Sequence, residues 1–318
     1  MPNLLDIKNL KVYFHTELGV AKAVDGISLS VDKGETVGIV GESGCGKTVS
    51  ALSILKLTPK PGEIAGGEIL FKGQDLCALD ERAMQKIRGA EIAMIFQEPM
   101  TALNPVFTIG NQIAEGILLH QNVSTKEAWD RAIEMLTKVQ IPNAKQRVNE
   151  YPHQLSGGMR QRAMFAMALA CNPSLLIADE PTTALDVTIQ AQVLDLMIEM
   201  KQQFGASIIL ITHDLGVVAQ TCDKVVVMYA GKVAEVAPVN NLFDNPCHPY
   251  TIGLLDSIPT RKKGGRLSEI KGVVPTLLDR PDGCYYNPRC PKVMDICREK
   301  SPKLKKTGAD SMAACWLH

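Results

Sequence analysis

Residues 36–48 read TVGIVGESGCGKT, and this stretch decides which fold the chain can adopt. A short strand-like run is followed by a turn rich in glycine and then by Lys47 and Thr48, which fits the pattern G-x-x-x-x-G-K-[ST]. The glycines let the backbone curl so that successive N–H groups point at one anion, and a helix N-terminus adds a partial positive charge. The segment therefore predicts a loop that binds the phosphates of a nucleotide.

The parts of this loop have different expected roles. Lys47 would reach the β- and γ-phosphates as a point charge, and the hydroxyl of Thr48 would take a coordination position on Mg²⁺. The alternative is a glycine-rich turn that matches by chance, but a strand-like run and a helix-like run stand on the two sides, as the pattern requires. We expect the whole loop to contact ATP: Gly41, Glu42, Ser43, Gly44, Cys45, Gly46, Lys47 and Thr48.

A second apolar run, residues 174–178, ends in the carboxylates Asp179 and Glu180. Asp179 would hold Mg²⁺, often through water, and Glu180 would polarise the water that attacks the γ-phosphate. The alternative is an acidic strand end that caps the next element. Beside a phosphate loop, the pair favours nucleotide hydrolysis.

Short apolar runs alternate with helix-like stretches along the chain, which predicts an α/β fold with parallel strands buried on both faces. The expected strands are residues 36–40, 92–96, 175–178, 207–212 and 224–229. A helix is expected over 124–140, with a capping box of Ser124 and Glu127. Its apolar face would consist of Trp129, Ile133, Leu136 and Val139. After about residue 240 the sequence becomes irregular and rich in proline, so we expect one domain over 1–240 and another over 241–318.

Composition narrows the class of protein. The chain has 318 residues, of which 46% are hydrophobic and 21% charged, as in a globular protein. The 34 basic and 34 acidic residues cancel, yet residues 261–318 hold 13 basic and 6 acidic side chains, a net +7. The first residues do not match a secretory signal, so we expect the nine cysteines to be in a reducing compartment. The apolar runs are shorter than the roughly 20 residues that a membrane-spanning helix needs, so we expect no membrane span.

Residues 155–159 read LSGGM and resemble the LSGGQ-type signature of ATP-binding cassette (ABC) ATPases. Met159 departs from the usual glutamine, which matters little because in that family the phosphate contacts come from the serine hydroxyl and the glycine N–H groups, which correspond here to Ser156, Gly157 and Gly158. The resemblance implies that these three residues close over the γ-phosphate held by a partner's loop, so hydrolysis needs two cassettes. A plain helix N-cap at Ser156 is an equally good structural interpretation, and the two can coexist.

The ABC resemblance covers roughly residues 4–240 and assigns further roles. It implies a P-loop NTPase fold with a RecA-like core, an antiparallel β-subdomain, a helical subdomain over about 98–168 and a small irregular C-terminal domain. Gln97 matches the glutamine that contacts Mg²⁺ and the attacking water, Asp186 lies in the D-loop, and His213 matches the switch histidine. Phe14, or its neighbour Tyr13, stands where the family stacks an aromatic ring on adenine.

Two stretches resemble the peptide and nickel importer branch of the family: residues 97–110 and the His248-Pro249-Tyr250 segment. The resemblance implies an ATPase at the cytoplasmic face of the cell membrane that drives uptake of di- or oligopeptides. Its partners would be a second ABC ATPase subunit, two membrane-spanning permease subunits and, indirectly, an extracytoplasmic peptide-binding protein. Import of a nickel complex, a soluble ABC ATPase of DNA repair or translation and a regulatory module remain alternatives. Nucleic acid is not an expected partner, because few aromatics are interleaved with the basic tail.

Four cysteines are concentrated in the last 35 residues: Cys284, Cys290, Cys297 and Cys315. They could hold an iron–sulfur cluster, hold structural zinc or stay unligated. Zinc sites usually show paired C-x2–4-C spacing, which this stretch lacks. Because similar C-terminal domains of peptide-importer ATPases are associated with a [4Fe–4S] cluster, the resemblance favours that cofactor, and the basic tail would offset its negative charge.

Overall fold

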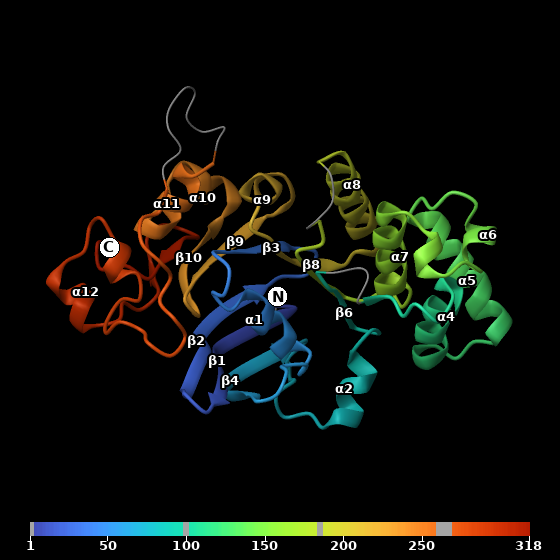
Figure 1. The fold of residues 1–318 in the computed structure, drawn as a ribbon, viewed down its shortest axis with the longest axis horizontal. Coiled ribbons are helices and arrows are strands. Elements are labelled where there is room, and N and C mark those ends of the chain that lie inside the picture. The colour runs from blue at the N-terminus through green and yellow to red at the C-terminus, as the bar shows by residue number, and fades with distance from the viewer. Residues whose placement is uncertain (1–2, 98–101, 183–186, 259–268) are drawn as a thin grey trace. The chain divides into compact units, whose positions relative to one another are not determined.

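The computed structural model describes residues 3–97, 102–182, 187–258 and 269–318. The chain separates into two compact units, residues 1–78 with 211–318 and residues 79–210 (Figure 1). Among the helices formed by the described residues, none is both long enough and apolar enough to cross a bilayer.

The first unit contains an antiparallel sheet in the order β2-β1-β4-β5. Its strands are β1 (Leu5–Thr16), β2 (Gly19–Val31), β4 (Gly62–Phe71) and β5 (Gln74–Asp75). β1 lies between β2 and β4, so that Phe14 stands opposite Ala21 on one side and Gly62 on the other. Apolar residues with period 2, such as Leu5 and Ile7, are buried and give the sheet a core-facing side.

A second sheet of this unit has the order β11-β12-β10-β9-β3. Its strands are β3 (Thr36–Val40), β9 (Lys224–Tyr229), β10 (Lys232–Pro238), β11 (Lys305–Lys306) and β12 (Met312–Ala313). β3 and β9 run parallel, whereas β10 returns antiparallel to β9 and pairs on its other side with β12. A strand from the end of the chain therefore extends this sheet.

The helices of the first unit follow its strands closely. They are α1 (Lys47–Ile54), α9 (Leu215–Thr221), α10 (Val239–Asp244), α11 (Pro249–Asp256) and α12 (Asp295–Glu299), and a short 3-10 turn, η3, covers Asn287–Arg289. α11 begins where proline favours a helix start, because Pro249 is the first helical residue and His248 is the N-cap. Figure 1 shows α10 and α11 beside β10.

The second unit contains three strands in the order β8-β7-β6: β6 (Ile92–Ile95), β7 (Leu175–Asp179) and β8 (Ser207–Ile211). β6 and β7 are parallel, and Ile95 pairs with Ala178. The helices are α2 (Glu81–Ile87), α4 (Ile109–His120), α5 (Thr125–Lys138), α6 (Ala144–Arg147), α7 (Gly157–Leu169) and α8 (Val187–Phe204), and a 3-10 turn, η1, covers Pro152–Gln154.

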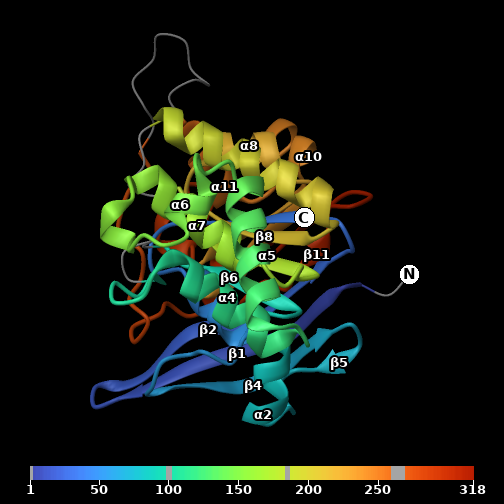
Figure 2. The same cartoon turned by 90° about the vertical axis from the view of Figure 1, so that its right-hand side faces the viewer.

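Helices α4, α5 and α7 pack against one another, as both views show (Figures 1 and 2). The predicted helix over 124–140 is confirmed as α5, with Ser124 as its N-cap. Its predicted apolar face was partly wrong. Trp129 and Ile133 are only half-buried, whereas the small side chains of Ala128 and Ala132 are fully buried, because small residues let neighbouring helices approach closely.

The strands predicted from continuous apolar runs are confirmed. β3 and β9 have the predicted bounds, and the ends of β6, β7 and β8 differ from the prediction by one residue. All five residues of β3, β7 and β8 are buried, as expected for strands covered on both faces. The resulting α/β fold places a loop after β3 in the first unit and two polar residues after β6 and β7 in the second.

Candidate functional site

The predicted phosphate loop connects β3 to α1, as the sequence pattern requires. Gly41 has φ +151°, and a Cβ there would lie 2.2 Å from the backbone oxygen of Met228. Gly46 has φ +100°, and a Cβ there would lie 2.5 Å from the backbone oxygen of Ala23. Only glycine fits these two positions, because the neighbouring atoms are backbone and cannot move aside. The loop is thus fixed at both ends by strands of the same unit.

Lys47 is held inside the loop at the start of α1. Lys47 is only 7% exposed. Nζ donates to Gly41 O at 2.8 Å and to Glu42 O at 3.2 Å. Ser43, Gly44 and Thr48 are exposed. An anion can therefore approach backbone N–H groups and a helix N-terminus there, with the Lys47 ammonium behind them, so these residues fit a nucleotide phosphate.

Cys45 is the buried member of the loop. Burial raises the pKa of its thiol, although the charge of Lys47 works in the opposite direction. Its backbone oxygen accepts from Gly231 N at 2.9 Å. The backbone of Cys45 therefore anchors the loop to Gly231, and its buried thiol, which burial favours in the neutral form, packs inside the loop.

His213 lines the same cavity as the start of the phosphate loop. This cavity of about 400 Å³ is lined by Gly41 and Glu42 on one side and by His213 and α9 on another. Thr212 N donates to Ile39 O at 3.3 Å, which ties the residue before His213 to β3. Asp214 then caps α9 by accepting from Gly216 N at 2.8 Å. The structure thus brings the predicted switch histidine to the predicted phosphate loop.

In the second unit, Gln97 and Glu180 contact each other directly. Gln97 Nε2 donates to Glu180 Oε2 at 3.1 Å. The contact arises because β6 and β7 are parallel neighbours, so the residues after their carboxyl ends meet at one edge. Asp179, the last residue of β7, is 2% exposed. Glu180 has φ +46°, an uncommon value for a residue with a side chain and one that often marks functional sites.

The signature residues form the start of α7. Ser156 is the N-cap, and its Oγ accepts from Met159 N at 3.3 Å, while Gly157 and Gly158 make the first turn. Gln161, buried in the same helix, donates to Pro181 O at 2.5 Å and so connects α7 to the chain after Glu180. The N-cap interpretation is confirmed, and the predicted phosphate contact stays a prediction. Asp186 lies outside the described residues.

Tyr13 and Phe14 differ in their surroundings. Tyr13 Oη donates to Asp25 Oδ1 at 3.1 Å, and Asp25 also accepts from Tyr285 at 2.7 Å. Burial alone would raise the pKa of Asp25, but these hydrogen bonds and the charge of Lys232 outweigh it and lower the pKa. The ring of Phe14 lies against Gly62 of β4. Tyr13 is therefore engaged in a polar network, which leaves Phe14 as the better candidate for an adenine contact.

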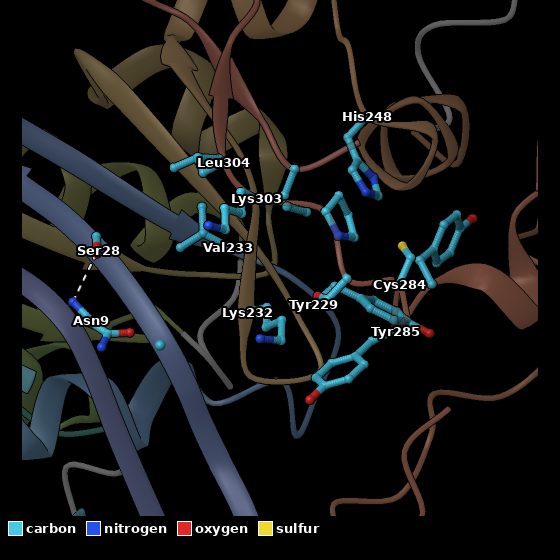
Figure 3. A pocket seen from close by; sticks show the side chains of 16 residues that line it. Asn9, Ser28, Tyr229, Lys232, Val233, His248, Cys284, Tyr285, Lys303 and Leu304 are labelled. Carbon is cyan, nitrogen blue, oxygen red and sulfur yellow. Dashed lines mark hydrogen bonds between the residues drawn. The ribbon is translucent and has the colours of Figure 1, made fainter. Parts of the chain in front are cut away.

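A second cavity of the first unit, about 490 Å³ in volume, lies next to this network (Figure 3). Its walls come from β1, β2, β9, β10 and residues 241–318, which we call the C-terminal segment, and Lys232, Tyr285 and Cys284 are among its lining residues. Lys232 stands over the ring of Tyr285 at 5.1 Å and pairs with Asp25 at 3.2 Å. The cavity is thus bordered by groups that already satisfy one another's charge.

The four C-terminal cysteines interact electrostatically. Burial raises the pKa of Cys284 to about 11, and Cys297, Cys315 and Cys290 add to the rise. Cys284 N donates to Cys297 O at 2.8 Å. Within the described residues, however, no three His, Cys, Asp or Glu side chains are arranged to hold a metal ion. The donor chemistry suits a metal but the arrangement is not a ligand group, so the iron–sulfur cluster stays a prediction.

The sequence did not reveal two residues that touch the phosphate loop, Tyr250 and Arg289. Both belong to the C-terminal segment, and both contact Glu42. The His-Pro-Tyr motif stands out in the sequence, but nothing in its local sequence shows that the tyrosine hydroxyl reaches a loop more than 200 residues away. For Arg289, neighbouring residues gave no signal at all.

Comparison with known proteins gives matches over the whole chain. The ABC transporter family model matches residues 24–183, and the model of the oligopeptide/dipeptide transporter C-terminal region matches residues 234–297. The probable peptide ABC transporter ATP-binding protein y4tR of Sinorhizobium fredii is 54% identical, over 98% of this chain and 94% of that protein. The oligopeptide transport ATP-binding protein AppD of Bacillus subtilis is 53% identical, over 100% of this chain and 98% of its own length.

Solved structures agree with the fold. The dimeric bacterial ABC transporter cassette MJ0796 superposes with a TM-score of 0.66 at 27% identity, over 74% of this chain and 98% of that one. Its match covers a cassette alone, whereas the C-terminal family model accounts for much of the remaining chain. The chain therefore belongs to the ABC transporter ATP-binding subunits, in the branch that carries the oligopeptide/dipeptide transporter C-terminal region.

Proposed function

We propose that this ABC ATPase is the ATP-hydrolysing subunit of an importer of di- or oligopeptides, working at the cytoplasmic face of the cell membrane. The phosphate loop carries the nucleotide part of the proposal, because its glycine positions, buried Lys47 and exposed Thr48 suit a bound triphosphate. The peptide cargo is supported by relatives such as AppD and the dipeptide transport ATP-binding protein DppD of Bacillus subtilis, which is 50% identical.

In this proposal the residues of each unit have separate tasks. Lys47 and the loop N–H groups bind the β- and γ-phosphates, and Phe14 stacks on adenine. Thr48, Gln97 and Asp179 would hold Mg²⁺, which supplies positive charge to offset the charge of the transferring phosphoryl group. Glu180 would polarise the attacking water, and His213 would contact the γ-phosphate and align that water. No covalent enzyme intermediate is needed.

We infer that two cassettes work together. The chain carries one phosphate loop and one signature, Ser156 to Gly158, and in the proposal each signature closes over the nucleotide of a partner cassette. The partner is a second ABC ATPase, identical or homologous, and the pair drives two membrane-spanning permease subunits. An extracytoplasmic binding protein delivers the peptide. The solved cassette MJ0796, which is dimeric, supports the pairing.

The substitution Glu180→Gln tests the assignment of the water-polarising residue. The variant should bind ATP and accumulate as a closed ATP-bound dimer, while phosphate release falls by about 100-fold or more, because a general base typically contributes this much. The matched control is Glu199→Gln on α8, an exposed glutamate that accepts from Gln140 at 3.1 Å. Near-normal turnover by the Glu180 variant would reject its role.

The cargo can be tested in proteoliposomes that hold the chain, its partner ATPase and the permease subunits. Uptake of labelled dipeptides or longer peptides, dependent on ATP and on the binding protein, is the expected result. Uptake of a nickel complex in place of peptides would replace the proposed cargo. If the rate of ATP hydrolysis is the same with and without the permease subunits, a role outside transport would be favoured instead.

We also propose that Cys284, Cys290, Cys297 and Cys315 ligate a [4Fe–4S] cluster. The support is the resemblance of the four-cysteine spacing to that of peptide-importer ATPases, together with the hydrogen bond from Cys284 N to Cys297 O at 2.8 Å. Burial raises the pKa of Cys284, Cys290 and Cys315, so a bound metal centre would have to supply the positive charge that keeps these thiols deprotonated. Anaerobically purified protein should be brown with about four irons per chain. Cys290→Ser should lose iron, whereas Cys247→Ser should not. A colourless chain with zinc, or with no metal, would reject the cluster.

A further inference from the structure

Arg289 connects the C-terminal segment to the phosphate loop. It lies in the turn between Cys284 and Cys290, and its side chain is 3% exposed. Nη1 donates to Glu42 Oε2 at 2.7 Å and Nη2 donates to Glu42 Oε1 at 3.0 Å, a bidentate pair across 247 positions of sequence. Bidentate arginine–carboxylate pairs are directional as well as strong, so they fix the orientation of the carboxylate.

The guanidinium is itself held in place on its other sides. Nε donates to Lys271 O at 3.0 Å, Nη2 donates to Ile270 O at 3.2 Å, and Nη1 reaches Tyr229 Oη at 3.4 Å. A buried ion pair costs desolvation unless hydrogen bonds satisfy its remaining groups. Here these bonds satisfy the guanidinium, so Arg289 is an ordered support for Glu42.

The backbone of Glu42 is held as well. Its N–H donates to Tyr250 Oη at 2.9 Å. Tyr250 is fully buried and packs against Tyr229, with ring centroids 4.7 Å apart, and against Tyr286 at 5.4 Å. Both the amide and the carboxylate of one loop residue are therefore set by the C-terminal segment.

The position of Glu42 also affects Lys47, the lysine proposed to bind the phosphates. Its backbone oxygen accepts from Lys47 Nζ at 3.2 Å and from Cys45 N at 3.3 Å. The peptide after Glu42 thus helps to set the position of the Lys47 ammonium and the curvature of the loop. In the pattern G-x-x-x-x-G-K-[ST] this position is unspecified, because phosphate binding needs only the backbone there.

We propose that Arg289 is a positioning residue for ATP: by holding Glu42 it fixes the phosphate loop, so that ATP affinity depends on docking of the C-terminal segment. The inference rests on the proposed function, since it requires that the loop binds ATP. A merely structural ion pair would affect the stability of the fold and leave the nucleotide affinity unchanged.

The test is a double-mutant cycle on the full-length chain, with the Kd for Mg·ATP and the melting temperature measured for each variant. Arg289→Met should weaken ATP binding by about tenfold, the change that corresponds to about 1.4 kcal/mol. Glu42→Gln should have a similar effect, and the double variant should be no weaker than the weaker single one. Arg289→Lys should fall in between, because an ammonium cannot reproduce the bidentate geometry.

Lys224→Met is the matched control. Lys224 pairs with Glu35 at 2.9 Å in the same unit, and both side chains are largely buried. Its loss should lower the melting temperature without changing the Kd. If Arg289→Met lowers the melting temperature but leaves the Kd unchanged, or if the effects of Arg289→Met and Glu42→Gln simply add, the proposal is wrong. A wild-type chain that fails to bind ATP would instead reject the proposed function.

Discussion

His248 is a buried residue whose imidazole and backbone each make a structural hydrogen bond. Its imidazole Nδ1 accepts from Tyr250 N at 3.0 Å and so caps α11, while its backbone N–H donates to the buried carboxylate of Glu235 at 2.8 Å. Burial lowers the pKa of His248 to about 4, with a smaller contribution from His318. The imidazole is therefore neutral in the folded protein at neutral pH, as its acceptor role requires.

This lowered pKa predicts a pH-dependent stability. The folded-state value lies below the ordinary 6.5, so the contribution is complete above pH 6.5 and is lost as the pH falls from 6.5 to about 4. It amounts to about 3.5 kcal/mol at most, at about 1.4 kcal/mol for each pKa unit. His248→Asn, which keeps a capping oxygen, should flatten this part of the curve of unfolding free energy against pH. The exposed His153 is the control, and an unchanged curve in the His248 variant would contradict the assignment.

At this scale the sequence predicted residues that a local pattern marks. The phosphate loop was found because its chemistry needs glycine and lysine at fixed spacing, and the contact of Gln97 with Glu180 follows from two adjacent parallel strands. The sequence did not predict the roles of Arg289 and Tyr250, because these roles depend on tertiary contacts with Glu42. No period or motif encodes such a pair when its members stand so far apart in the chain.

Among the elements, α7 carries two interpretations of Ser156 that can be separated. As an N-cap, Ser156 contributes about 1 kcal/mol to stability, and Ser156→Ala should lose it. Ser156→Asn should keep the cap. If the hydroxyl also binds a partner's γ-phosphate, ATP hydrolysis by the assembled transporter should fall in both variants, while the unfolding free energy falls only in the alanine variant.

Ser124→Ala gives the matched control for this prediction. Ser124 caps α5 through the same kind of bond, from Glu127 N at 3.2 Å, and its loss should cost similar stability without affecting hydrolysis. Full activity of Ser156→Asn would show that Ser156 is a cap and nothing more. Denaturant unfolding and phosphate release, measured on the same preparations, separate these outcomes.

Elements were predictable where burial dominates their sequence. The strands β3, β7 and β8 are buried on both faces, so continuous apolar runs revealed them. The antiparallel sheet of β1, β2 and β4 followed only from the family resemblance. The predicted apolar face of α5 is displaced by about one residue, because hydrophobicity favours the bulky Trp129 and Ile133, whereas close helix packing buries the small side chains of Ala128 and Ala132 completely.

At the scale of the molecule, the charge difference between residues 1–260, here called the body, and residues 261–318, here called the tail, can be related to contacts in the structure. The tail carries a net +7 in a chain whose total charge is zero, so the body carries a net −7. Two of the tail's arginines pair with acidic residues of the body: Arg289 with Glu42 in the phosphate loop, and Arg280 with Asp25 in β2. The tail also adds β12 to the edge of β10. The predicted boundary at residue 240 stays a prediction, and these contacts allow it to be tested.

Removing residues 241–318 should damage the rest of the first unit. Strand β10 would lose its pairing with β12, in which Glu235 stands opposite Ala313, and would present an open edge. Glu235, now fully buried, would lose the N–H groups of Cys247 and His248 that its carboxylate accepts. We expect the truncated chain to aggregate, or to unfold several kcal/mol more easily, since breaking up a buried charged network costs about 3–5 kcal/mol.

The affinity for Mg·ATP tests the same truncation more specifically than stability does. Without Arg289 and Tyr250 the truncated chain would lack the hydrogen bonds through which the C-terminal segment holds Glu42, so it should bind Mg·ATP more weakly than the full chain. For the same reason, Glu42→Gln should weaken ATP binding in the full chain but make no further difference after truncation. Denaturant unfolding and ATP titration of the four chains measure both effects. A truncated chain with the full chain's midpoint and Kd would show instead that residues 1–240 fold and bind ATP as an independent domain.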